Sequence, residues 1–175
     1  PVFFAELNDI LYFRADDGIH GEELYQYDLS TGQASLAANI RPFEESSNIE
    51  KVVAYIGKIY FPGRDGIGSA KYLMVYDPAD QSVGRLQDMD GERAWDAFDP
   101  FVFNGELFFA ADFSVEGDEL GKYNSNTDQI DFVADLNPTG DCNPSQFVEA
   151  DGKLWFLATT GQAYGNLCMY DPQTD

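Results

Sequence analysis

Short apolar segments recur along this chain at a nearly constant interval. Four similar segments occupy residues 9–13, 57–61, 105–109 and 152–156. Their closing residues, which lie 48, 48 and 47 positions apart, are Phe13, Phe61, Phe109 and Phe156. A second apolar segment, opened by a leucine, follows each of them, at residues 24–28, 73–77, 120–124 and 167–171. Several landmarks that keep one period indicate a tandem repeat of about 48 residues.

These segments have the character of β-strands. Each is short, rich in aromatic and β-branched residues, and bounded by Gly, Asp, Asn or Pro, which is typical of strands. No window shows a period of 3.6 residues, so we expect little helix. Residues 154–157 are apolar on both faces of their strand, and both faces must then be covered. Four strands per repeat predict an all-β fold, a β-propeller built from four blades of about 48 residues. We expect a single repeat domain with blades at residues 1–48, 49–97, 98–144 and 145–175. A β-sandwich is the alternative, but it does not explain the strict period.

The connections between strands divide into short and long ones. The first and second strands of each repeat are joined by two-residue turns at 8–9, 56–57, 104–105 and 151–152. Asn-Gly and Asp-Gly favour tight hairpins of this kind. The longer connections meet at the opposite face, where loops over a rigid scaffold usually carry function. This long-loop face is acidic, with Asp16, Asp17, Glu22, Glu23, Glu44, Glu45, Asp90, Glu92, Asp96, Asp99, Asp112, Glu116, Asp118 and Asp141.

The charge of the chain limits its partners. Thirty-one acidic residues stand against ten basic ones, which gives a formal net charge of −21. Such a surface repels phosphate backbones, so we expect no nucleic acid partner. It favours cationic partners instead. No apolar stretch approaches the ~20 residues that a membrane helix needs, so we expect no membrane insertion.

The first repeat resembles a known family. Residues 11–25 read Leu-Tyr-Phe-Arg-Ala-Asp-Asp-Gly-Ile-His-Gly-Glu-Glu-Leu-Tyr, and residues 134–141 read Ala-Asp-Leu-Asn-Pro-Thr-Gly-Asp. Both stretches resemble the ELWxxDGT-type repeat of secreted and surface bacterial proteins. The resemblance spans all four repeats and is close in the first and third, although Tyr25 replaces the family's Trp. It implies an exported, non-enzymatic β-propeller.

Aromatic residues on the long loops are candidate binding residues. Trp95 and Phe98 lie in the connection before the third blade, and Phe43 lies in the corresponding connection after the first. Aromatic side chains on loops commonly anchor protein or sugar partners. The alternative is that they fold down and cap the contact between blades. We place Asp16, Asp17, Glu22 and Asp96 beside them as candidate binding residues.

Metal and catalytic motifs are weak. Asp16, Asp17 and Glu22 offer the clustered oxygens that Ca²⁺ prefers, but they match no EF-hand loop. Calcium is therefore a candidate ligand there, and we expect no other cofactor. The single histidine, His20, lies in a glycine-flanked turn with no nucleophile motif in the chain. We therefore assign no catalytic residue.

The two cysteines could form one disulfide. Cys142 lies in the long connection before the fourth repeat and Cys168 in its third strand. In an oxidising compartment a bridge would close the loop between them and stabilise the folded protein by about 3 kcal/mol. The strand could instead hold the two residues too far apart to pair.

These observations favour a non-catalytic binding module that acts outside the cell, at the cell surface or in the periplasm. Its partner would be a protein, with a basic surface as the best match, or a glycan. A lectin-like propeller and a polysaccharide-active hydrolase or lyase are the alternatives. The fourth repeat ends after its third strand, and natural sheets usually avoid an open edge. We therefore expect these residues to belong to a longer propeller chain.

Overall fold

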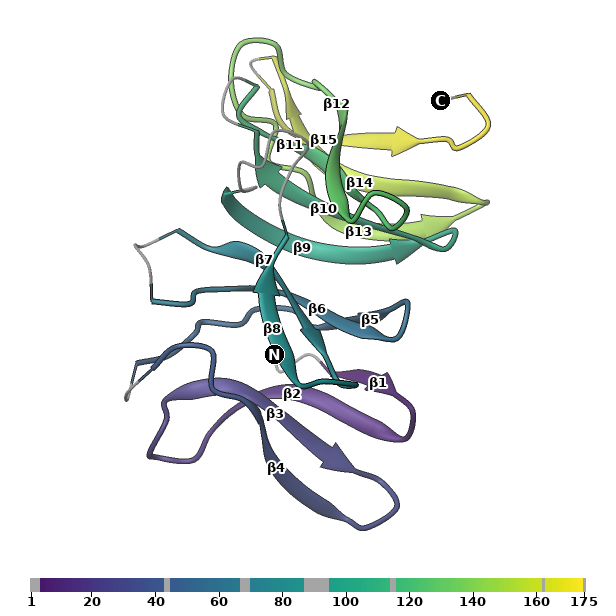
Figure 1. The fold of residues 1–175 in the computed structure, drawn as a ribbon. Helices are drawn as coiled ribbons and strands as arrows, with labels where there is room; N and C mark the ends of the chain where they lie inside the picture. The colour runs from purple at the N-terminus through teal and green to yellow at the C-terminus, as the bar shows by residue number, and fades with distance from the viewer. Residues whose placement is uncertain are drawn as a thin grey trace. The chain divides into compact units, whose positions relative to one another are not determined.

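The chain folds as β-sheet throughout its described parts. The computed structural model describes residues 4–42, 45–66, 70–86, 95–113, 116–161 and 163–174. These residues form fifteen strands and no helix (Figure 1). No helix long and apolar enough to cross a membrane occurs among them. The prediction of an all-β chain is confirmed.

The chain divides into two compact units, Pro1–Leu86 and Gln87–Asp175, and within each unit consecutive strands pair antiparallel as two sheets. The first sheet comprises β1 (Ala5–Leu7), β2 (Ile10–Asp16), β3 (Glu22–Asp28) and β4 (Gln33–Ala38). The second comprises β5 (Val53–Tyr55), β6 (Lys58–Gly63), β7 (Tyr72–Asp77) and β8 (Ser82–Arg85). In the second unit, the third sheet comprises β9 (Trp95–Phe103), β10 (Glu106–Asp112), β11 (Asp118–Asn124) and β12 (Gln129–Ala134). The fourth sheet comprises β13 (Ser145–Ala150), β14 (Lys153–Thr160) and β15 (Ala163–Tyr170). Each sheet thus contains one of the four recurring apolar segments that close at Phe13, Phe61, Phe109 and Phe156.

Tight hairpin turns join the first two strands of every sheet, as predicted. At 104–105, Asn104 and Gly105 have φ angles of 50° and 76°. The other three turns also have positive φ at both positions, which a two-residue type I′ turn requires. Ile56 occupies one of these positions, with a φ of 46°. The left-handed conformation is unfavourable for a β-branched residue.

In the first unit, the two sheets pack face to face. We call the face of a sheet that meets the next sheet along the chain its forward face, and the opposite one its back face. The forward face of the first sheet carries Ala5, Tyr12 and Leu24. The back face of the second sheet carries Ile59, Phe61, Met74 and Tyr76. Together they form one buried core, in which the rings of Tyr12 and Tyr76 lie 5.9 Å apart.

The second unit repeats this packing with other side chains. The forward face of the third sheet brings Phe108 and Leu120 against Phe156 and Tyr170 on the back face of the fourth sheet. The rings of Phe108 and Tyr170 lie 5.2 Å apart. Because the two contacts use the same repeat positions, each unit is held together by the same interface.

Several strand boundaries differ from the sequence prediction. Asp16, Glu22, Asp112 and Asp118, which we expected on long loops, lie at the ends of strands. We expected Trp95, Asp96 and Phe98 on a long loop, but the structure places all three in β9. The strand reaches Trp95 because two irregularities interrupt its pairing with β10. Asp96 and Asp99 adopt positive φ angles of 46° and 49° there. Bulges of this kind absorb extra residues and let a strand continue.

The turn strain at Ile56 makes a testable prediction. Its side chain is 57% exposed, so its burial contributes little stability. Ile56→Asn should raise the free energy of unfolding by about 0.5–1 kcal/mol, because asparagine tolerates positive φ. Asn104→Ile, the reverse change in the equivalent turn, should lower it by a similar amount. Thermal unfolding measures both, and a lower melting temperature for Ile56→Asn would contradict the strain.

Candidate functional site

The loop between β2 and β3 uses its acidic residues to shape a turn. Asp16 Oδ1 accepts a hydrogen bond from the amide of Gly18 at 2.7 Å. Asp17 Oδ1 accepts from the amides of Ile19 and His20, both at 2.9 Å. The ring of His20 lies 2.8 Å from Asp17 Oδ2. These hydrogen bonds, led by the amide of His20, hold the pKa of Asp17 well below its usual range. His20 therefore stabilises the turn between β2 and β3.

The proposed calcium residues do not converge. Glu22 lies at the start of β3 and faces Arg14, with 3.5 Å between Arg14 Nε and Glu22 Oε1. Asp16 and Asp17 are turned to the amides of their own loop. Across the described ranges there is no group of three or more His, Cys, Asp or Glu side chains placed to hold a metal ion. The structure thus gathers Asp16, Asp17 and Glu22 into no such group.

In the first and third sheets, a buried glutamate in the third strand holds the long loop that follows the fourth strand. The sequence analysis did not predict this role. Glu23 is fully buried in β3, where its carboxylate accepts hydrogen bonds from the amides of Ile40 and Arg41 at 2.8 and 3.2 Å. Glu119 is fully buried in β11 and accepts from the amide of Leu136 at 2.9 Å. Burial raises the pKa of both carboxyls. The signal in the sequence is a glutamate that precedes the repeat leucine in the first and third repeats only.

The loop that follows each buried glutamate bridges two sheets. In the first unit, the amide of Ser47 donates to the carbonyl of Glu22, and its own carbonyl accepts from the amide of Arg64. In the second unit, Cys142 makes the same two hydrogen bonds, with the carbonyl of Asp118 and the amide of Thr159. The loop is therefore pinned between the third strand of one sheet and the second strand of the next.

The two cysteines are free thiols, so the disulfide considered between Cys142 and Cys168 is not formed. Cys142 occupies the repeat position of Ser47, and it lies fully buried beside the Glu119 carboxylate. Burial raises the pKa of the Cys142 thiol far above its ordinary value, and burial also raises that of Cys168. Both residues pack in the core between the third and fourth sheets, which explains their apolar surroundings.

Acidic side chains gather at the start of β11. Asp118 lies directly opposite Asp112 of β10, which lies opposite Trp95 of β9. Burial, followed by the negative charges of Asp141, Asp112 and Asp96, raises the pKa of Asp118 to about 6. We call Asp96, Asp112, Asp118 and Asp141 the acidic group. Of the predicted binding residues, the structure brings Asp96 into this group.

Asp141 can reach Asp118 because residue 117 is a glycine. The amide of Asp118 donates to Asp141 Oδ1 at 3.2 Å. A Cβ on Gly117 would collide with this same carboxylate oxygen, and Gly117 also has a φ of 85°. In the first unit the corresponding amide, of Glu22, donates to the hydroxyl of Ser46 at 3.0 Å. The repeat thus replaces a neutral hydroxyl with a carboxylate in the second unit.

Asp141 also lines a hollow of about 550 Å³ in the second unit. Its lining residues are Glu116, Gly117, Asp135, Pro138, Thr139, Gly140 and Asp141. Asn137 fixes this loop, because its side chain donates to the carbonyl of Asp141 at 3.0 Å and accepts from the amide of Gly161 at 3.2 Å. The hollow is therefore preformed and carries three carboxylates.

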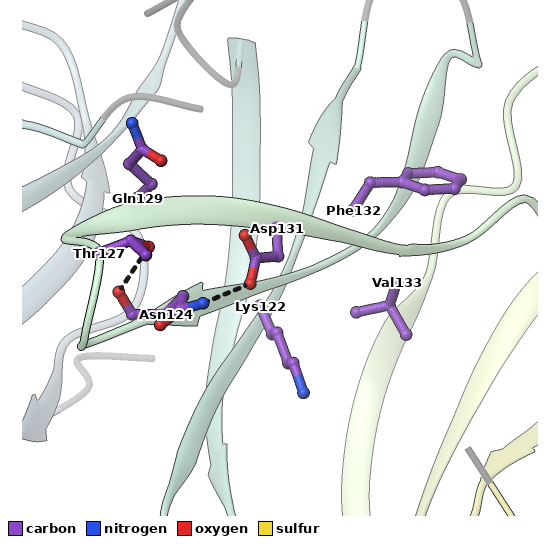
Figure 2. Close-up of a pocket in the computed structure, with 7 residues that line it drawn as sticks. All are labelled: Lys122, Asn124, Thr127, Gln129, Asp131, Phe132 and Val133. Carbon is purple, nitrogen blue, oxygen red and sulfur yellow. Dashed lines mark hydrogen bonds between the residues drawn. The ribbon is translucent and has the colours of Figure 1, made fainter. Parts of the chain in front are cut away.

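A second hollow, of about 600 Å³, lies along β11 and β12 (Figure 2). Figure 2 shows Asn124 and Asp131 pointing toward one another, and they are joined by a 2.8 Å hydrogen bond. Lys122 is paired with Glu106 at 3.0 Å. Because these polar groups satisfy one another within the sheet, we place the candidate site at the acidic group.

The predicted aromatic residues divide between described and undescribed positions. Phe98 is half-buried in β9 and lies opposite Ala110. The backbone of Trp95 lies in β9, but its side chain is outside the described part, as is the whole of Phe43. Trp95 as a binding anchor therefore stays a prediction.

The raised pKa values predict how stability changes with pH. Glu23, Glu119 and Asp118 have higher pKa values in the folded protein than in the unfolded chain. Their contribution to stability is complete below their unfolded values and is lost as the pH rises through the folded ones. Lowering the pH from 7.5 to 5 should therefore raise the free energy of unfolding, with Asp118 contributing on the order of 1 kcal/mol.

Urea unfolding at several pH values measures this dependence. Asp118→Asn should flatten the pH profile between 5 and 7, because asparagine does not titrate. Glu149→Gln, a change at an exposed carboxylate of β13, should leave the profile unaltered. A protein whose stability falls steadily from pH 7.5 to 5 would contradict the assignment.

The match between Cys142 and Ser47 makes a second prediction. Cys142→Ser should lower the free energy of unfolding by less than about 1 kcal/mol, because a hydroxyl at this position can also donate a hydrogen bond to the Glu119 carboxylate. Cys142→Ala should cost about 1–3 kcal/mol, since it leaves the buried carboxylate without that polar neighbour and opens a small cavity. Chemical denaturation of the two variants compares them, and equal losses would contradict a polar role for residue 142.

Known proteins resemble this chain in fold. No family model and no curated protein matches the sequence. Among solved structures, TolB from Acinetobacter baumannii is similar with a TM-score of 0.65 and 14% identity, over 99% of this chain and 42% of TolB. YjhT is similar with a TM-score of 0.54 and 14% identity, over 89% of this chain and 57% of YjhT. Puromycin hydrolase is similar with a TM-score of 0.53 and 14% identity, over 85% of this chain and 23% of the hydrolase.

The chain therefore spans less than two thirds of the length of each of these proteins. At 14% identity the likeness concerns the fold alone, and it carries no activity from the hydrolase to this chain. The neighbours are propeller-type proteins. The conclusion from fold and comparisons together is an all-β chain of four antiparallel sheets, similar to segments of propeller proteins.

Proposed function

We propose that this chain is a non-catalytic binding module, formed by blades of an exported β-propeller of the ELWxxDGT type, whose acidic group binds a basic segment of a protein partner. The observation that carries this proposal is the gathering of Asp96, Asp112, Asp118 and Asp141 at the start of β11. Burial, together with the negative charges of the other three aspartates, raises the pKa of Asp118 to about 6. A positively charged group placed there would relieve the repulsion.

A comparison of the two units supports a functional reason for this charge. In the first unit, arginines accompany the acids: Arg14 faces Glu22, and Arg41 pairs with Glu45 at 2.6 Å. The repeat positions of Arg14 and Arg41 are occupied by Ala110 and Asn137 in the second unit. The second unit has thus gained Asp141 and lost both arginines at equivalent positions. The first unit shows that the fold accepts arginines at these two positions. Stability therefore does not require their replacement in the second unit, which favours a role for the acidic group in recognition.

The rigidity of the loops supports binding as well. Glu119 and Asn137 hold the backbone of residues 136–141 through hydrogen bonds to buried groups. A loop fixed in this way loses little conformational entropy when a partner binds. Lysine and arginine side chains of a partner could therefore reach Asp141 and the adjoining hollow without remodelling the loop.

Binding to a short arginine-rich peptide tests the proposal. Fluorescence anisotropy at pH 7.5 should detect binding, and a glutamate-rich peptide of equal length should not bind. The double variant Asp118→Asn, Asp141→Asn should weaken the affinity by at least about fivefold, whereas Glu149→Gln should leave it unchanged. The affinity should also fall as the pH drops from 7.5 to 5.5, because Asp118 becomes protonated near pH 6. Equal affinity for the double variant and the unaltered chain would rule out the acidic group as the site.

A further inference from the structure

Glu119 is a fully buried acid whose carboxyl group is only partly satisfied. Its Oε2 accepts a hydrogen bond from the amide of Leu136 at 2.9 Å. Its Oε1 is buried and has no hydrogen-bond partner of ordinary geometry in the described part of the chain. A buried polar atom without such a partner is rare in folded proteins and requires an explanation. A negative charge at this position would be more costly still.

Glu23 occupies the same repeat position in the first unit and lacks this defect. One of its oxygens accepts from the amide of Ile40 and the other from the amide of Arg41, at 2.8 and 3.2 Å. Glu23 and Glu119 are both 0% exposed, so the difference does not arise from burial. The same backbone arrangement therefore holds one glutamate by both oxygens and the other by a single oxygen.

The charges around Glu119 oppose its ionisation. Burial raises the pKa of Glu119 and the negative charge of Asp135 raises it further, while hydrogen bonds from Cys142 and Leu136 offset part of the rise. Among the described residues of the second unit, Lys122 and Lys153 carry positive charge, and they pair with other carboxylates. The titratable groups on the elements that pack around Glu119 are acids and thiols: Asp118 on β11, Asp112 on β10, Asp135, Asp141 and Cys142 in the loop, and Cys168 on β15.

We propose that Glu119 carries a proton in the folded protein, and that loss of this proton releases the loop of residues 135–142 from β11. The neutral carboxyl accepts from the amide of Leu136 through one oxygen and shares a hydrogen bond with the thiol of Cys142 through the other. When the proton passes to water, a negative charge remains in a buried site among acids. Hydration of that charge requires water to enter where the loop lies on β11.

Release of the loop would make the acidic group dependent on pH, and this consequence rests on the proposed function. The loop carries Asp141, whose carboxylate accepts from the amide of Asp118 at 3.2 Å while the loop is closed. An open loop no longer holds Asp141 at this place. A basic segment then binds best between the pH at which Asp118 ionises and the higher pH at which Glu119 loses its proton.

The thiol of Cys142 reports the release directly, because it is 0% exposed while the loop is closed. In a Cys168→Ser chain, the rate of labelling with iodoacetamide is measured from pH 6 to 9. Dividing it by the rate for glutathione in the same buffers removes the increase that thiolate formation causes. The corrected rate should rise at least about tenfold with Glu119 present, and less than about twofold in Glu119→Gln, whose neutral amide does not titrate.

The first unit supplies a matched control at the equivalent loop position. Ser47→Cys, in a chain that also carries Cys142→Ser and Cys168→Ser, places the reporting thiol beside Glu23. Its corrected rate should change less than about threefold over the same pH range, because both oxygens of Glu23 are satisfied. An equal rise at both positions would indicate global unfolding and overturn the inference. An equal rise in Glu119→Gln and in the chain that keeps Glu119 would overturn it as well.

Carbon-13 NMR of the glutamate carboxyl groups tests the protonated state without changing Glu119. In a Glu23→Gln chain at pH 6, one carboxyl carbon should keep the chemical shift of the acid form, while exposed glutamates show the ionised form. Ionised shifts for every glutamate would overturn the inference, including the case in which Glu119→Gln does not fold. Neither measurement involves a binding partner, so its failure is distinguishable from a failure of peptide binding.

Discussion

Two buried carboxylates, Glu23 and Glu119, hold the long loops of this protein to its sheets. Each projects from the third strand of a sheet and accepts hydrogen bonds from amides of the loop that follows the fourth strand. A buried charge is costly unless hydrogen bonds compensate it. Glu23 is satisfied through both oxygens by the amides of Ile40 and Arg41, whereas Glu119 accepts from the amide of Leu136 through Oε2. The hydrogen bonds of Ser47 and Cys142 then connect the same loop to the next sheet.

This constraint explains how charge can accumulate at the start of β11. A mobile loop would move its carboxylates apart and lower their repulsion. The loop around Asn137 cannot do so, since its backbone is fixed from both sides. Asp141 consequently stays beside Asp118, and its negative charge adds to the effect of burial, which raises the pKa of Asp118 to about 6. The first unit has the same backbone arrangement, but there Arg14 and Arg41 lie beside the acidic side chains of Glu22 and Glu45. One scaffold thus supports two different electrostatic environments.

The sheets themselves depend on a single kind of contact, repeated. A forward face with an aromatic and a leucine meets a back face with a phenylalanine and a tyrosine. The same repeat positions form both faces in each unit, so one pattern builds the two cores. Ser47 and Cys142 occupy the same repeat position in the two units. The position is buried next to a carboxylate and accepts either small polar side chain.

The sequence by itself determined the strands, the sheet boundaries to within a few residues, and the four tight turns. These features depend on local propensity, on alternation and on a period that a single chain displays. It predicted Asp96, Asp118 and Asp141 on acidic long loops, whereas the structure places Asp96 in β9 and Asp118 at the start of β11. It did not separate the acids that shape turns, such as Asp17, from those that repel one another, such as Asp118. That distinction depends on distances between strands and loops remote in sequence, and on burial.

Only the tertiary structure decided that Trp95 continues a strand, that Cys142 and Cys168 remain thiols, and that Glu23 and Glu119 are buried. The physical reason is that hydrogen-bond partners and solvent exposure are properties of packed sheets, which no single repeat specifies.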